Sequence, residues 1–265
     1  MRSLVAVLVL LIAVPALAND AETMFNSPAY GWIDPVPGPV YQWERVVLYD
    51  NGPVNNYTQG TQALSVLQDT SLGHSTYGYG NQISAGNRVA DDFEVPVGET
   101  WLVQTITFFG YQTGSTTTST FTTYYVQLWK NGPPDVGTLV FGDLATNRLA
   151  TSVFASSYRT LESSLPTYGT TRPIMASTCN VPITLGPGQY WVDWTAAGTL
   201  ASGPWQPPVS IWGQGVTGDG LQKTSTGWAY VLNGTDNQGF PFVVEGTYAS
   251  AVETATWGGI KALYR

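Results

Sequence analysis

Short runs of alternating apolar and polar residues, separated by Gly, Pro, Asn and Asp, extend over most of the chain. The clearest run is residues 189–195, Q-Y-W-V-D-W-T, in which Tyr190, Val192 and Trp194 share one face. A period of two is that of a strand with one buried face. Gly186-Pro187-Gly188 precedes the run as a turn, so the pattern predicts a strand that begins near residue 189.

Further runs of the same kind predict most of the remaining structure. Helical periodicity of useful length is missing after the N-terminal segment, and residues 62–67 are the best short helical candidate, a turn or two at most. Many short strands without a strand–helix–strand rhythm favour antiparallel sheets. We therefore expect an all-β fold, a single antiparallel β-sandwich of the jelly-roll type. The other predicted strands are residues 45–49, 88–95, 101–109, 123–129, 138–141, 181–185, 209–212, 228–231 and 240–245.

The first eighteen residues have a different pattern. A basic start, Met1-Arg2-Ser3, precedes an unbroken apolar run over residues 4–14, and an Ala-x-Ala sequence ends at Ala18. This is the layout of a secretory signal peptide cleaved after Ala18. The apolar run is shorter than the roughly 20 residues that a membrane-spanning helix needs. We expect a signal peptide over 1–18, a proline-rich extended lead-in over 19–40, the sandwich over 41–265, and a secreted or extracytoplasmic protein without a membrane span.

The charge balance argues against polyanionic partners. Without Arg2 the chain has nine basic and eighteen acidic side chains, a net charge of −9. Affinity for nucleic acid comes mainly from Lys and Arg at phosphates, and anionic membranes attract the same side chains. We therefore expect no nucleic-acid partner. The single cysteine, Cys179, excludes an intramolecular disulfide and is expected to be buried.

The densest carboxylate cluster is Asp91, Asp92 and Glu94 in a predicted strand, with Asp92 and Glu94 on one face and Asp91 on the other. Three interpretations are open: solvated or backbone-capping acids, part of a calcium site, or an acid/base pair for glycoside cleavage. Calcium is the one cofactor that the sequence suggests. Asp193, in the strand 189–195, is outward-facing or paired, and is the next carboxylate to consider.

The other chemically reactive residues are isolated in the sequence. Asp50, Asp219 and Asp236 lie in turn sequences, where Asp bonds its own local backbone. The only histidine, His74, lies in a loop sequence, and the G-x-S-x-G elbow of serine hydrolases is missing. One His and one Cys are too few ligands for a usual zinc site.

Aromatic residues are abundant, with 10 Trp and 15 Tyr. Most lie in predicted strands, where aromatic side chains commonly form the core. Trp205, Trp212 and Trp228 lie in or next to loop sequences and are the candidates for a sugar-stacking platform. A neutral, Trp-rich exported sandwich fits carbohydrate binding, because rings stack on sugar faces while amides bind hydroxyls.

Four segments resemble exported bacterial β-sandwich modules of the choice-of-anchor type. They are R-V-A-D-D-F-E-V-P (88–96), I-T-F-F-G-Y (106–111), V-Q-L-W-K-N-G-P-P (126–134) and L-G-P-G-Q-Y-W-V-D-W (185–194). The resemblance implies a sandwich fold and an extracytoplasmic setting, and no catalytic activity. The leading hypothesis is a non-catalytic binding or adhesion module for a polysaccharide or a cell-surface partner. The alternatives are a structural surface or matrix protein and a glycan-active hydrolase.

Overall fold

The computed structural model describes residues 46–248, which belong to one compact unit. The predicted signal peptide, its cleavage position after Ala18 and the proline-rich lead-in lie outside the described residues. The described chain consists of strands and two short 3₁₀ helices, η2 (Ile83–Ala85) and η3 (Glu162–Ser164). The all-β prediction is therefore confirmed.

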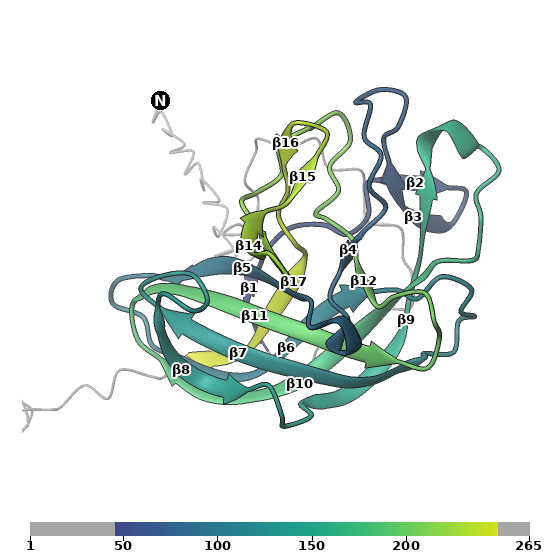
Figure 1. The fold of residues 1–265 in the computed structure, drawn as a ribbon. Helices are drawn as coiled ribbons and strands as arrows, with labels where there is room; N and C mark the ends of the chain where they lie inside the picture. Colours follow the sequence, from purple (N-terminus) through teal and green to yellow (C-terminus); the bar gives the residue numbers. More distant parts are fainter. Residues whose placement is uncertain (1–45, 249–265) are drawn as a thin grey trace, which may run out of the picture. The chain divides into compact units, whose positions relative to one another are not determined.

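Eight strands form two four-stranded antiparallel layers (Figure 1). One layer has the order β1-β17-β6-β10 and the other the order β5-β11-β7-β8. In chain order these strands alternate between the layers except for β7 and β8, which are consecutive neighbours in one layer, and this is the strand order of a jelly roll. Their bounds are β1 (Val46–Asp50), β5 (Arg88–Val95), β6 (Trp101–Gly110), β7 (Phe121–Lys130), β8 (Thr138–Asp143), β10 (Pro173–Leu185), β11 (Gly188–Gly198) and β17 (Phe242–Tyr248).

Additional strands widen both layers and form two small ribbons. The first layer continues from β10 through β9 and β3 to β2, and the second from β5 through β13 to β14. The β3–β9 pair is parallel, whereas every other strand pair of the described sheets is antiparallel. The added strands are β2 (Tyr57–Gln59), β3 (Gln62–Leu67), β9 (Leu149–Leu161), β13 (Leu221–Thr224) and β14 (Gly227–Tyr230), and the ribbons pair β4 (Tyr79–Gly80) with β12 (Trp205–Gln206) and β15 (Leu232–Asn233) with β16 (Asp236–Asn237).

The core lies between the two layers and is rich in aromatic rings. The predicted face of β11, with Tyr190, Val192 and Trp194, is buried in it. Trp194 stacks on Phe108 of the opposite layer with the ring centroids 4.6 Å apart. Because successive side chains of a strand point to opposite faces, one alternating pattern in each strand is enough to form this core.

The strand predictions are wrong in several places, and three of these have a clear local reason. Residues 62–67, the helical candidate, form β3, because pairing with β2 and β9 supplies partners for the backbone on both edges. Residues 209–212 form no strand, since Val209 and Ser210 donate their backbone N–H groups to the loop carbonyls of Gly239 and Pro53. The long strand β9 was not predicted, because its Ser- and Thr-rich sequence carries a weak alternation.

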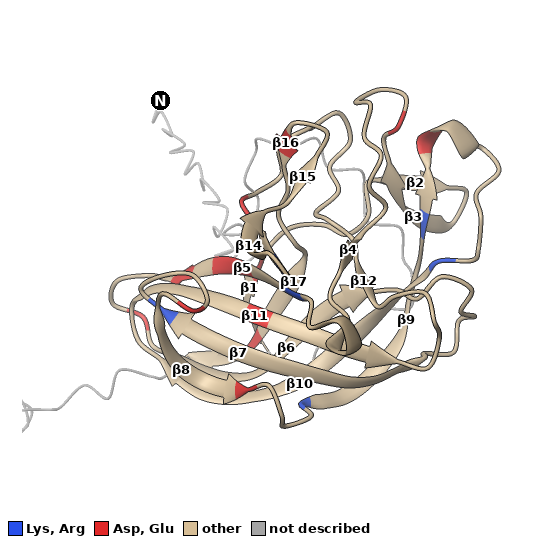
Figure 2. Cartoon of the chain, in the orientation of Figure 1, with Lys and Arg blue, Asp and Glu red and all other residues tan. Residues whose placement is uncertain are grey.

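Within residues 46–248, no helix is long and apolar enough to cross a membrane. Charged positions are sparse, and Lys and Arg are scattered singly over the ribbon (Figure 2).

Candidate functional site

A polar pocket lies beside β3 and β9. Its cavity volume is about 20 Å³, room for roughly one water-sized group, and it is open to solvent. Its lining comes from β3, from β9, from the loop that follows β12 and from the loop that contains β15 and β16. The polar side chains of the lining include those of Asn56, Gln68, His74, Arg159, Ser210 and Gln214.

The amide side chains of the pocket hold its walls together. Asn56 exchanges two hydrogen bonds with the backbone of Val66, at 2.8 and 3.0 Å. Gln68 accepts from the backbone N–H of Gly213 at 3.0 Å. The Gln68 bond ties the loop after β12 to the residue that follows β3, and the Asn56 bonds hold the segment before β2 against β3. The pocket is therefore preformed.

Arg159 is the unusual residue of the pocket. It is 2 % exposed, and its guanidinium donates to three neutral oxygens: the carbonyl of Tyr77 at 2.8 Å and the hydroxyls of Ser65 and Ser210 at 3.0 and 3.1 Å. Within residues 46–248, no carboxylate lies within 4.0 Å of its nitrogens. Burial lowers the pKa of Arg159 to about 10. The side chain stays charged at neutral pH, without a counter-ion.

His74 also lines the pocket, and its Nε2 lies 3.1 Å from a carboxylate oxygen of Asp236. The structure thus brings together two residues that the sequence left isolated in separate loops. Ser75 beside His74 donates its backbone N–H to Asn233, an ordinary loop contact. This arrangement holds the loop in place.

An exposed aromatic pair flanks the pocket. The rings of Tyr57 and Trp212 lie 5.4 Å apart between centroids, tilted by 35°, and Trp212 is 44 % exposed. Each follows a pocket residue in the sequence, Tyr57 after Asn56 and Trp212 after Ile211. Of the three predicted platform residues, Trp212 therefore lies at the pocket, and Tyr57, which the sequence did not single out, joins it.

Trp205 and Trp228 lie elsewhere. Trp205 is half-buried in β12 and its indole N–H reaches Ser202 in its own loop. Trp228, on β14, donates to Asp135 at 2.9 Å, and the guanidinium of Arg88 lies 5.0 Å from its ring centroid. No ring contact among the described residues joins either of them to Trp212. The three tryptophans do not form one platform.

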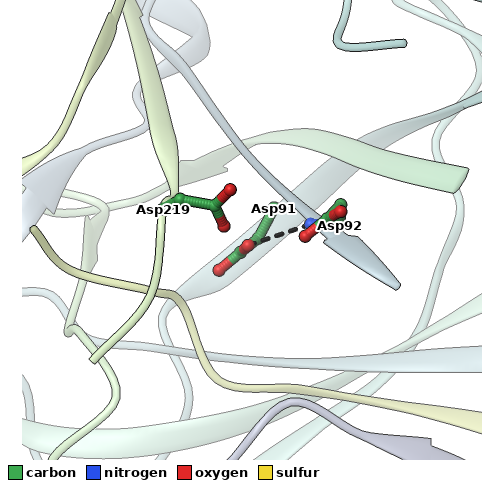
Figure 3. A group of neighbouring side chains, drawn as sticks. All are labelled: Asp91, Asp92 and Asp219. Atoms are coloured by element: carbon green, nitrogen blue, oxygen red, sulfur yellow. Dashed lines mark hydrogen bonds between the residues drawn. The ribbon is translucent and has the colours of Figure 1, made fainter. Parts of the chain in front are cut away.

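Three carboxylates meet at the edge between β5 and β13 (Figure 3). The members are Asp91, Asp92 and Asp219, each with a carboxylate oxygen within 4.8 Å of the others. Asp219 reaches the group because β13, which begins two residues later, pairs with β5 at Ala90. Glu94, the third residue of the predicted calcium cluster, is exposed farther along β5 and is not in this group.

Asp91 is the buried member of the trio. It accepts from the backbone N–H of Phe240 at 2.6 Å and from the amide of Asn51 at 2.9 Å. Burial raises its pKa to about 7, and the charges of Asp219 and Asp92 add to this. The folded state therefore binds a proton more tightly than the unfolded chain does. Three neighbouring carboxylates, one of them with a pKa near neutral pH, form a group of oxygen ligands that suits a cation such as Ca²⁺. Calcium binding itself stays a prediction.

The stability of the protein is expected to fall as pH rises from about 4 to about 7, through the ionisation of Asp91. A carboxyl whose folded-state pKa lies above its unfolded value stabilises the protein below the unfolded pKa and loses that effect as pH passes the folded one. Urea unfolding at pH 5 and at pH 8 measures this change in the free energy of unfolding. If the trio binds calcium, added Ca²⁺ raises the midpoint at pH 8 more than at pH 5, because proton and cation compete for Asp91.

Asp219→Asn is expected to reduce both the pH effect and the calcium effect, because it removes the charge that disfavours ionisation of Asp91. Glu94→Gln is the matched control, a neighbouring exposed acid outside the trio. Equal responses to Ca²⁺ in the parent protein and in Asp219→Asn would remove the calcium assignment.

Asp193 is buried on the outer face of β11 and is paired, one of the two arrangements expected for it. Arg88 donates to it through Nε at 3.0 Å and through Nη2, and Arg88 also reaches Gln127 at 3.3 Å. The pair lies under Trp228, next to a small cluster of Ala90, Trp191 and Leu221. Cys179 is free and fully buried, as expected, and burial raises the pKa of its thiol.

Sequence reasoning missed Arg159 and Tyr57. The one available signal was an arginine inside the Ser- and Thr-rich run that forms β9, and it becomes informative only when that run is recognised as a strand. Comparison of the chain with protein-family models, with curated proteins and with solved structures found no match.

Proposed function

We propose that this protein is an exported, non-catalytic carbohydrate-binding module. The observation that carries the proposal is the exposed Tyr57–Trp212 pair beside a preformed polar pocket. Aromatic rings bury the apolar face of a sugar ring, and neighbouring polar groups bind its hydroxyls. The pocket itself is small, so that it takes one substituent of a sugar while the aromatic pair supports the ring.

The surroundings of the pair support this proposal over adhesion through a charged surface. Residues 46–248 contain only six Lys and Arg residues, and these come from several different elements (Figure 2). Binding through stacking and neutral hydrogen bonds is weakly dependent on salt, unlike binding to nucleic acid. An extracytoplasmic location, predicted from residues 1–18, would give such a module access to polysaccharide.

Trp212→Ala is expected to weaken glycan binding about tenfold or more, a loss of about 1.4 kcal/mol, because the exposed ring supplies most of the stacking surface. Tyr57→Ala should weaken it less, since the ring is half-buried. A glycan array identifies the ligand, and isothermal titration calorimetry with that glycan measures the affinity of each variant.

Tyr230→Ala is the control, because Tyr230 is 60 % exposed on β14 and does not line the pocket. An array without any retained glycan, or unchanged affinity in Trp212→Ala, would contradict the proposal. In the first case concentration-dependent assembly would favour the structural-protein alternative. Release of reducing sugar that is lost in Asp92→Asn would favour the hydrolase alternative.

A further inference from the structure

The guanidinium of Arg159 is a buried cation that lacks a partner of opposite charge in the described chain. Desolvating a charge is costly, and buried charges are normally paired with an opposite one. The three oxygens around Arg159 are neutral, and its Nη2 has no hydrogen-bond partner among residues 46–248. The nearest acid at the pocket, Asp236, is engaged by His74.

The position of Arg159 makes its free donor useful to a ligand. Arg159 lines the solvent-open pocket, and the Tyr57–Trp212 pair flanks the same pocket. Arg172 adds a second positive charge nearby, with its guanidinium 4.0 Å from the ring centroid of Tyr77, whose carbonyl accepts from Arg159. Among the described residues that line the pocket, Arg159 carries the one guanidinium and none is Asp or Glu.

We propose that the pocket binds the carboxylate of an acidic sugar, with Arg159 as its charged partner and the Tyr57–Trp212 pair against the sugar ring. The inference rests on the proposed carbohydrate binding and names its substrate class, the uronate-containing polysaccharides. A carboxylate can accept from Nη2, the one guanidinium nitrogen of Arg159 without a partner among residues 46–248, and such charge-assisted hydrogen bonds are stronger than neutral ones. Its charge supplies the counter-ion that the protein itself does not provide.

The test compares a galacturonate oligosaccharide with the neutral galactose oligosaccharide of equal length, at fixed ionic strength, by isothermal titration calorimetry on the full protein. We expect the acidic ligand to bind at least about tenfold more tightly than the neutral one. Gln214→Glu, which adds a negative charge to the pocket lining without emptying the core, should remove this preference. Gln104→Glu is the matched control, because it adds the same charge at an exposed position of β6 outside the pocket.

Arg159→Met should likewise bind both ligands equally, provided that its circular dichroism spectrum matches the parent; Gln214→Glu carries the test if Arg159→Met does not fold. Equal binding of both oligosaccharides by the parent protein overturns this inference and leaves the proposed function intact. Binding of neither also overturns this inference, whereas the proposed function is overturned only by a glycan array that retains no glycan. A preference for acetate equal to that for galacturonate shows a site for free small anions and overturns the assignment to a sugar.

Discussion

Replacing Trp194 by alanine is expected to lower the free energy of unfolding by about 3–5 kcal/mol. The side chain is fully buried and its ring contacts Phe108 and Phe242 of the opposite layer and Phe240 in the loop before β17. Its indole N–H donates to the buried amide of Gln206 at 3.2 Å, so that the substitution also leaves a buried acceptor without its donor. Urea unfolding followed by far-ultraviolet circular dichroism measures the change.

Two further variants separate the causes of that loss. Trp194→Phe keeps most of the ring volume and removes the N–H, so that its cost should be clearly smaller. Trp212→Ala removes a ring of the same size from an exposed position and should change the free energy of unfolding by less than about 1 kcal/mol. A Trp194→Ala protein as stable as Trp212→Ala would show that the two layers do not pack around Trp194.

Asp193→Asn is expected to destabilise the protein by about 3–5 kcal/mol, because it leaves the guanidinium of Arg88 buried without its main counter-charge. Asp193 has no exposed surface, and the side chain of Arg88 is 9 % exposed. The second acid near Arg88, Asp135, is 3.8 Å away, is half-exposed, and already binds Lys223 at 2.6 Å. It can replace Asp193 only in part.

The double variant Arg88→Met, Asp193→Leu tests whether the loss comes from the unpaired charge. Replacing both members of a buried ion pair by apolar side chains of similar size is often neutral or stabilising, so the double variant should recover most of the stability that Asp193→Asn loses. If the double variant were less stable than Asp193→Asn, the pair would have to stabilise the fold beyond its charge balance. Thermal and urea unfolding of the three proteins decide between these outcomes.

Local alternation predicts the sandwich because the spacing of apolar residues within each strand indicates which face of that strand is buried. In residues 189–195 the predicted face of Tyr190, Val192 and Trp194 lies in the core, and residues 123–129 bury Tyr124, Val126 and Leu128 with the same spacing of two. In residues 101–109 a strict alternation would place Leu102 on the face of Ile106 and Phe108, but Leu102 is 39 % exposed, and Trp101 and Val103 lie in the core instead. Register shifts in the pairing of β6 with β17 and β10 change which residues of this strand face the core. No local sequence pattern encodes these shifts.

The sequence by itself determined the all-β class, the main strands and the alternation of most core faces, because these depend on residues a few positions apart. Only the tertiary structure decided which side chains lie together in the carboxylate trio, the aromatic pair and the pocket. Asp219 joins Asp91 and Asp92 because β13 pairs with β5, Tyr57 meets Trp212 across more than 150 residues, and Arg159 reaches the pocket from a strand with weak alternation. These contacts depend on pairing between distant strands and on loops fixed by side-chain bonds, which short-range patterns do not encode.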